Sequence, residues 1–292
     1  MLAAALFGLS PPLAKLLIGE THPQLLAGLL YLGSGVGLSI TLAGRRLISP
    51  QRETRPRVAG REWAWLAGAI LFGGVVAPVL LMTGLARTTA ASASLLLNLE
   101  GVFTAFIAWF VFREGVNRRV AVGFALILAG GIAISWTAGV GLHLSPAALL
   151  IIGACACWGI DNNFTRKISH ADSFTTAALK GVCAGVVNVV LARAIGADFP
   201  PGGQIAAALA LGFVSYGLSL VFFIIGLRHV GAARTGAYFS TAPFIGALIA
   251  GVFLHEKLAF NVWIAGGLMA VGVWLHLTES REETERAMQS VR

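Results

Sequence analysis

Charged residues are scarce in this sequence. Only 12% of its 292 residues are Asp, Glu, Lys or Arg, whereas 57% are hydrophobic. A soluble domain carries roughly 25% charged and about 45–50% apolar residues. The deficit of charge therefore excludes an ordinary soluble enzyme or binding domain. It indicates a chain that sits in a lipid bilayer, where its 36 glycines allow helices to pack closely.

Enzyme and cofactor motifs are also missing. The sequence has no P-loop, no HExxH zinc motif, no nucleophile elbow and no dinucleotide fingerprint. The missing P-loop excludes an ATP-driven pump for this chain alone. Cysteine is limited to Cys155, Cys157 and Cys183, all in apolar stretches, where we interpret them as small packing residues. We therefore expect no enzyme activity, no cofactor and no metal.

Long apolar stretches fill the chain. A membrane-spanning helix needs about 20 mostly apolar residues. We assign ten spans, at 1–19, 25–43, 63–85, 90–112, 120–136, 147–166, 174–195, 205–227, 232–254 and 260–277. The first lacks a basic leading segment and a clear cleavage site, so we expect a span rather than a signal peptide. The predicted fold class is an all-α integral membrane protein with ten transmembrane helices.

Basic residues gather on alternate sides of these spans. The loops after the second, fourth, sixth and eighth spans, together with the C-terminal tail, hold sixteen Lys and Arg. The other side holds only Arg87, Arg193 and Lys257, with Lys15 near its edge. Because positive residues favour the cytoplasm, we expect both termini to be cytoplasmic in a bacterial inner membrane. The same placement argues against nucleic acid as the reason for the net charge of +8.

The second half of the sequence repeats the first. Residues 84–114 align without a gap with residues 226–256, at an offset of 142. Because each repeat has an odd number of spans, the second must cross the membrane upside down. We expect a first five-helix repeat at 1–139, an inverted one at 145–277 and a cytoplasmic tail at 278–292. The two repeats are expected to enclose a central cavity.

Three motifs occur in both halves. An aromatic-Gly pair with a basic residue downstream occurs as Phe7-Gly8…Lys15 and as Trp158-Gly159…Arg166. A run of small and then apolar residues ends at Glu114 and at Glu256, and a Gly-rich span follows each. With these motifs the chain resembles the drug/metabolite transporter superfamily with two EamA-type repeats.

The resemblance covers nearly the whole chain. It implies ten helices around a central cavity, alternating access and the export of small metabolites. In style the chain is similar to amino-acid exporters of the YddG type. The family pattern places a proline in the middle of spans 4 and 9; Pro243 fits, but Gly101 stands in the first copy, preceded by Glu100. That departure predicts two halves that are chemically unequal in mid-membrane.

Glu100 is the first candidate site residue. A charge in mid-membrane costs about 2.5–3.5 kcal/mol on insertion scales and often marks a pathway. Glu100 could exchange a proton or hold a substrate ammonium group; alternatively it is a protonated acid that bonds a neighbouring helix. Asn98 is two residues away, which is about 200° of rotation on a helix, so both cannot point fully inward.

Span 6 carries a polar patch that has a counterpart in span 1. The patch contains Trp158, Asp161 and Asn162, and at an offset of 151 the counterparts of the last two are Ser10 and Pro11. Interrupted spans at corresponding positions point to a transport site. The alternative for Asp161 is a polar helix end near the headgroups, and for Trp158 a packing residue.

Other candidates for the cavity are spread over spans 3, 8 and 9. Pro78 is expected to bend span 3, either as a gating hinge or as a static kink. A tyrosine offers an apolar wall with one hydrogen bond, whereas buried Ser and Thr more often bond their own backbone. These candidates are Tyr216, Tyr238, Ser240 and Thr241. Lys180 is expected to extend to the interface, which disfavours phosphorylated substrates.

The most consistent reading is a secondary transporter that exports small metabolites, above all neutral or aromatic amino acids. Efflux of drugs or apolar cations is the alternative, and an intramembrane enzyme acting on lipid is a more distant one. The expected partners are a small-molecule substrate and the lipid bilayer. The GxxxG spacings at 33–37 and 181–185 are expected to pack inside a monomer, with dimerisation as the alternative.

Overall fold

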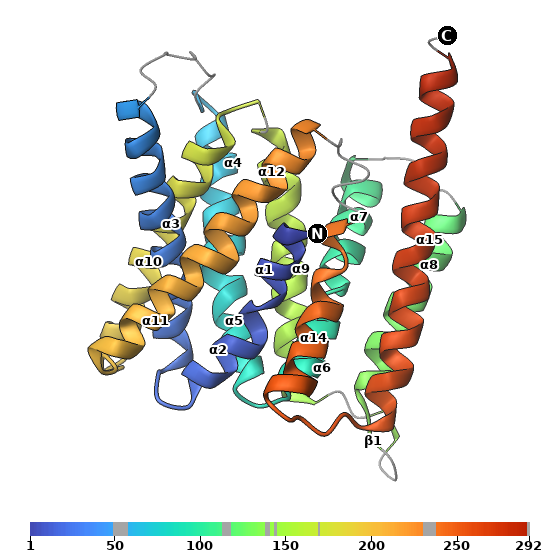
Figure 1. The fold of residues 1–292 in the computed structure, drawn as a ribbon, viewed down its shortest axis with the longest axis horizontal. Coiled ribbons are helices and arrows are strands. Elements are labelled where there is room, and N and C mark those ends of the chain that lie inside the picture. The colour runs from blue at the N-terminus through green and yellow to red at the C-terminus, as the bar shows by residue number, and fades with distance from the viewer. Residues whose placement is uncertain are drawn as a thin grey trace.

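The computed structural model describes residues 1–48, 58–112, 118–137, 141–142, 145–168, 170–229 and 238–290. In these residues the chain is a bundle of helices that run roughly parallel or antiparallel, with the C-terminal helix at one side (Figure 1). Six helical stretches are long and apolar enough to cross a membrane, and three shorter apolar helices accompany them. The predicted all-α membrane fold is confirmed, while the count of ten spans stays a prediction.

Several predicted spans of the first half are broken helices. Span 1 consists of α1 (Leu2–Gly8) and α2 (Ser10–Ile18), span 2 is α3 (Pro23–Ile48), and span 3 consists of α4 (Glu62–Ala69), the π-helix η1 (Ile70–Val76) and α5 (Ala77–Leu85). Span 4 consists of α6 (Ala90–Leu96) and α7 (Leu99–Phe112), and span 5 is α8 (Arg118–Ile134). Glu114 lies outside the described residues.

The second half has a continuous helix at its polar patch. Its elements are α9 (Pro146–Lys167), α10 (Ser173–Ala194), α11 (Gly202–Gly212), the π-helix η2 (Phe213–Leu218), α12 (Ser219–His229), α14 (Ala242–Phe253) and α15 (Phe260–Ser290). α9 is continuous through its polar patch. The counterpart of that patch in span 1 lies at the break between α1 and α2. Pro forces a helix to reorganise, whereas Asp and Asn fit a helix whose side chains find partners. α15 includes most of the predicted tail.

A short hairpin joins the two halves. The strands β1 (Trp136–Thr137) and β2 (Gly141–Leu142) pair in antiparallel fashion, with Trp136 opposite Leu142. Trp136 was expected to end span 5 but begins this strand instead. The helix ends at Ile134, and aromatic residues fit a pleated strand better than most.

The two π-helices occupy matching places in the repeats. Adding the offset of 142 to η1 (Ile70–Val76) gives residues 212–218, which almost coincide with η2 (Phe213–Leu218). In the first copy Pro78 follows in the first turn of α5. Proline has no backbone N–H and cannot donate the hydrogen bond that the helix requires at its position. A widened turn is one way for a helix to accommodate this loss. The predicted irregularity at Pro78 therefore lies in the turn that precedes it.

Helix contacts follow the same internal symmetry. α9 packs on α7 and α5, and correspondingly α1 packs on α14 and α12. α3 packs along α10, and α8 packs along α15. The α3–α10 crossing is very close, because a Cβ added at Gly35 would lie 2.3 Å from the backbone nitrogen of Val182. The GxxxG glycines of both helices thus pack inside the bundle.

Candidate functional site

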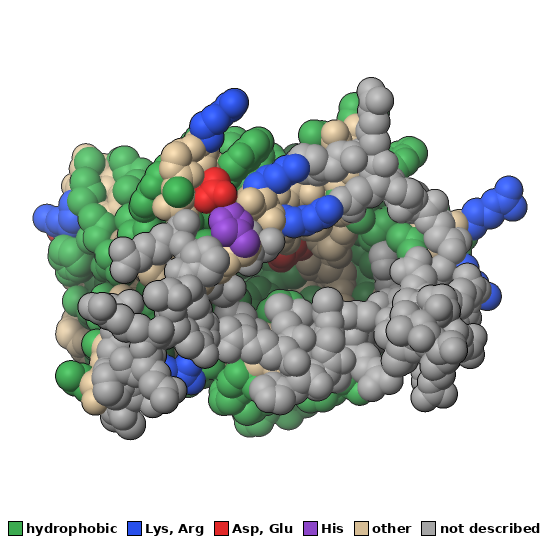
Figure 2. Space-filling model, turned by 90° about the horizontal axis from the view of Figure 1, so that it is seen from above, with side chains coloured by type: hydrophobic (Ala, Val, Ile, Leu, Met, Phe, Trp, Pro, Cys, Tyr) green, Lys and Arg blue, Asp and Glu red, His purple; other side chains and the backbone are tan. Residues whose placement is uncertain are grey.

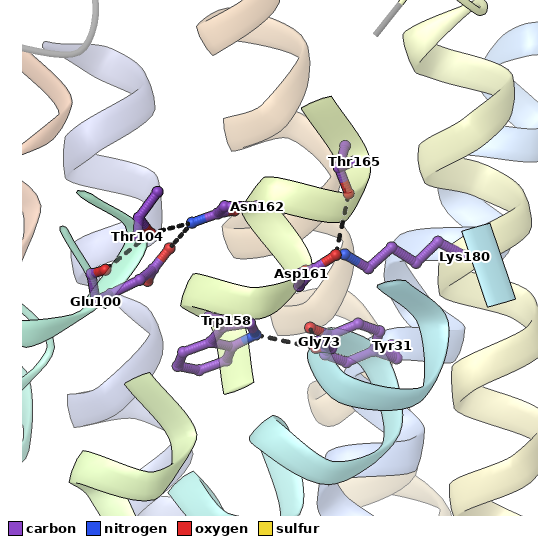
Figure 3. Close-up of polar contacts among 9 residues, drawn as sticks. All are labelled: Tyr31, Gly73, Glu100, Thr104, Trp158, Asp161, Asn162, Thr165 and Lys180. Carbon is purple, nitrogen blue, oxygen red and sulfur yellow. Dashed lines mark hydrogen bonds and ion pairs between the residues drawn. The ribbon is translucent and has the colours of Figure 1, made fainter. Parts of the chain in front are cut away.

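The polar face of α9 is the centre of the candidate site. Glu100 and Thr104 of α7 lie on one side of α9, and Lys180 of α10 lies on the other (Figure 3). Trp158 and Asp161 of α9 lie between them, close to η1 and to Tyr31 of α3. Five helical elements from both halves of the chain therefore contribute to one polar cluster.

Glu100 is held by a short network of hydrogen bonds. Asn162 Nδ2 donates to Glu100 Oε1 at 2.9 Å and to Thr104 Oγ1 at 3.1 Å. Thr104 Oγ1 in turn donates to the backbone oxygen of Glu100 at 2.8 Å. Glu100 has no ion pair with a basic side chain in the part of the chain that the structure describes. Among the described residues, the side-chain bonds of Glu100 thus come from neutral groups.

The Glu100 network faces open space. Asn162 and the neighbouring Gly101 are exposed, while Glu100 is half-buried. A Cβ at Gly101 would meet no atom within 4 Å. Seen from above, the molecule is hollowed near its middle, and acidic atoms are visible deep in the hollow behind basic side chains (Figure 2). Asn162 and Gly101 therefore border open space beside Glu100.

Asp161 has a partner of its own. Its Oδ2 pairs with Lys180 Nζ, and its Oδ1 accepts a hydrogen bond from Thr165 Oγ1 at 3.0 Å. The Asp161 side chain is only 6% exposed, and that of Lys180 is 20% exposed. The expectation that Lys180 extends to the interface is therefore wrong. A buried carboxylate attracts the ammonium group more strongly than the headgroup region does, because neither charge is stable alone in a low-dielectric interior.

Backbone carbonyls of η1 are part of the same cluster. Trp158 Nε1 and the Tyr31 hydroxyl donate to the backbone oxygen of Gly73, at 2.9 and 2.7 Å. Asn188 Nδ2 donates to the backbone oxygen of Gly74 at 3.0 Å. A π-turn leaves backbone groups without regular helical partners, and in a membrane these groups need other donors. The side chains of α3, α9 and α10 supply them.

Aromatic rings form an apolar wall beside the polar cluster. The Tyr216 ring lies 5.6 Å from that of Tyr31 and 5.8 Å from that of Phe7, measured between centroids. Ser10 Oγ donates to the Tyr216 hydroxyl at 2.9 Å. Ser10 and Tyr216, which were proposed from opposite halves of the sequence, are thus direct partners.

Other predicted site residues lie elsewhere. Asn98 is buried and donates to the backbone oxygen of Leu95 at 3.0 Å, so its amide serves the break between α6 and α7. Pro11 and Pro78 are buried within their helices. Thr241 Oγ1 donates to the backbone oxygen of Tyr238 at 2.6 Å, and Tyr238 is 49% exposed. The role of these residues and of Ser240 in the cavity stays a prediction.

The sequence reading missed several members of the cluster. Tyr31, Gly73, Thr104, Thr165 and Asn188 all bond a site residue or an η1 carbonyl. Thr104 and Thr165 stand four residues after Glu100 and Asp161, a spacing that places two side chains on one helix face. That spacing is a signal in the sequence, whereas the positions of Tyr31 and Asn188 depend on how α3 and α10 pack.

Comparison with known proteins now decides the family. The EamA-like transporter family matches residues 1–136 and 145–278, nearly the whole chain and once for each half. The chain belongs to the EamA-like transporter family. This EamA protein is a multi-pass membrane transporter and not an enzyme. In the described residues no three His, Cys, Asp or Glu side chains are grouped so that they could hold a metal ion.

Relatives of this EamA protein are also transporters by name. An uncharacterized transporter of Methanothermobacter thermautotrophicus (strain Delta H) is 27% identical over 285 residues, covering 94% of this chain and 83% of the relative. The uncharacterized transporter YyaM of Bacillus subtilis (strain 168) is 20% identical over 203 residues, covering 66% of each. A solved crystal structure aligns with a TM-score of 0.69 at 20% identity over 96% of each chain, which shows the fold alone.

Proposed function

We propose that this EamA transporter exports small metabolites that carry an ammonium group, amino acids above all, across the bacterial inner membrane. The observation that carries the proposal is Glu100, a carboxylate that is held by Asn162, lies beside the exposed Gly101 and has no basic partner among the described residues. A half-buried carboxylate held only by neutral groups favours binding of a cation or a proton.

The neighbouring charges leave Glu100 as the acid without a basic partner. Asp161 and Lys180 pair with each other on the other side of α9. An amino acid would therefore find in Glu100 a carboxylate for its ammonium group. Trp158, Tyr31 and Tyr216 would contact the apolar part of its side chain.

Alternating access is the mechanism that this architecture supports. Two repeats with matching π-turns meet at the site, and the hollow opens toward one end of the bundle. In the proposed cycle the substrate enters from the end where α3 ends and α4 begins, which the positive residues of the sequence assign to the cytoplasm. Rocking of one repeat against the other would then open the opposite end.

The test is flux of labelled amino acids in proteoliposomes. We expect saturable counterflow for at least one neutral or aromatic amino acid, and a large loss of that flux in Glu100→Gln, which keeps the side-chain size but removes the charge. Asp198→Asn is the matched control, because Asp198 is 96% exposed and pairs only at the surface with Arg193. If no amino acid shows saturable flux, the assigned substrate class is wrong.

Efflux of apolar cations is a second candidate, because the Glu100 carboxylate stands in the same cluster as the aromatic rings of Trp158, Tyr31 and Tyr216. Rings of this kind attract cations as well as apolar groups. Cells that express the transporter can be grown with toxic lipophilic cations and, separately, with toxic amino-acid analogues. Resistance to the cations alone would favour this candidate over amino-acid export.

A further inference from the structure

The basic side chain of Lys15 holds the start of the turn between α5 and α6, where α5 ends. Lys15 Nζ donates to the backbone oxygen of Leu85 at 2.6 Å and to that of Thr88 at 2.7 Å. The last carbonyls of a helix have no partner within the helix, and a cation satisfies both their hydrogen bonds and the negative end of the helix dipole. Lys15 therefore ties span 1 to the end of span 3.

An acidic side chain holds the other end of the same turn. The two carboxylate oxygens of Glu256 accept hydrogen bonds from the backbone nitrogens of Ala90 and Ala91, at 2.7 and 2.9 Å. Thr89 completes the cap by accepting from the backbone nitrogen of Ser92 at 3.1 Å. Glu256 belongs to the connection between α14 and α15, so its carboxylate links the second half of the chain to the first.

The backbone next to Glu256 is strained. His255 has a φ of +50°, and it is the one non-glycine residue with a positive φ in the part of the chain that the structure describes. Residues other than glycine adopt this conformation at a cost, and they keep it where the surrounding structure imposes it. Here the turn directs the following carboxylate onto the amides of α6.

These contacts lie at the end of the bundle opposite the hollow. The α5–α6 turn and the α14–α15 connection are at the lower end of Figure 1, whereas the hollow is seen from above (Figures 1 and 2). We propose that Glu256, positioned together with Lys15 on the α5–α6 turn, is the latch that keeps the outer gate of this transporter closed. The inference rests on the proposed alternating access and adds the residues that hold one of its two states.

The chemistry of the contact suits a gate. A carboxylate on two amides forms charge-assisted hydrogen bonds, which are stronger than neutral ones but short in range, so a small displacement breaks them. Water can replace the lost partners at the membrane surface once the contact opens. Lys15 and Glu256 interact electrostatically, so the turn is clamped by two opposite charges that compensate each other. Opening of this end requires that Glu256 leave α6.

Two cysteine reporters in a cysteine-free background test the latch. Ser94 is 1% exposed and lies one helical turn inside the capped end of α6, so Ser94→Cys reports access from the outer side. Gly101 is exposed to open space, so Gly101→Cys reports access from the hollow. Each reporter is treated with a membrane-impermeant maleimide, the first on intact cells and the second on inside-out vesicles.

Glu256→Gln is expected to raise the labelling rate of Ser94→Cys about tenfold and to lower that of Gly101→Cys, because the loss of a charge-assisted bond shifts the population toward the outward-open state. Lys15→Gln should change both labelling rates in the same directions as Glu256→Gln. Lys15→Arg keeps the positive charge and should leave both labelling rates at their native values. Lys257→Gln is the matched control, since Lys257 is exposed on the same connection and should change neither rate. A variant that merely unfolds would raise labelling at both reporters.

The latch is refuted if Glu256→Gln leaves both rates unchanged, raises both, or acts no more strongly than Lys257→Gln. The labelling needs no substrate, so the result is independent of which solute the protein carries. Amino-acid flux with unchanged labelling would refute the latch and leave the proposed function standing. Opposite shifts of the two labelling rates without any amino-acid flux would support the latch and refute the proposed substrate class.

Discussion

Trp158 and Tyr31 donate hydrogen bonds to the same backbone oxygen, that of Gly73 in η1. The contact joins three spans that are distant in the sequence, and it lies directly beside the Asp161–Lys180 pair (Figure 3). A π-turn thereby becomes part of the site wall, and its shape depends on two aromatic side chains. Two aromatic donors thereby fix the position of η1 beside Asp161.

The shared acceptor predicts non-additive mutations. Tyr31→Phe or Trp158→Phe alone leaves one donor on the Gly73 oxygen and should lower the free energy of unfolding by about 1 kcal/mol. The double variant removes both donors and should lose more than the sum, because a buried carbonyl is then without a side-chain partner. Thermal unfolding of the four purified proteins in detergent checks this, and strictly additive losses would contradict it.

The Asp161–Lys180 pair predicts a rescue. Lys180→Met should lower the free energy of unfolding by about 3 kcal/mol, because it leaves the Asp161 carboxylate buried and unpaired. Asp161→Asn should have an effect in the same direction. The double variant removes both charges and should recover much of the loss, since two neutral side chains need no compensation. Equal melting temperatures for Lys180→Met and the double variant would contradict the predicted rescue.

Asn162 is predicted to control affinity. Asn162→Ala removes the amide that holds Glu100, and we expect KM for the transported solute to rise about tenfold with a smaller change in kcat, as expected for one hydrogen bond to a charged group. Thr83→Val is the control, because the Thr83 hydroxyl only bonds the backbone of its own helix. A fall in kcat at constant KM would assign Asn162 to the conformational step instead.

The α3–α10 crossing predicts a strict steric requirement. Gly35→Leu would place a side chain against the backbone of α10, where even a Cβ comes within 2.3 Å of the Val182 nitrogen. The two helices would have to separate, so we expect little folded protein. Gly19→Leu is the matched control, since a Cβ there meets nothing within 4 Å. Size-exclusion chromatography of both variants in detergent compares the yields of folded protein.

Much of the fold could be predicted from local patterns. The apolar stretches correspond to helices because a bilayer allows few other backbones to cross it. The breaks were harder to predict: Ser10, Pro11 and Pro78 indicate irregular turns at the right places, but the split between α6 and α7 has no proline. The Asn98 side chain donates to the backbone oxygen of Leu95 at that break, so it does not bond to the Glu100 network.

The candidate site shows the same division. Glu100, Asp161 and Asn162 stand out because a polar side chain in an apolar stretch is costly. That rule does not predict whether Glu100 or Asp161 is paired with a basic side chain. Lys180 could extend to the headgroups or turn inward, and the choice depends on the packing of α10 beside α9.

Composition and spacing were thus enough to establish a membrane bundle, its two-fold repeat and the few polar groups inside it, since hydropathy and periodicity act along the chain. Packing alone decided that Lys180 compensates Asp161, that Asn162 holds Glu100, and that Glu256 reaches α6. Those contacts join residues far apart in the sequence. Their energies depend on distances of a few ångströms, which no local pattern encodes.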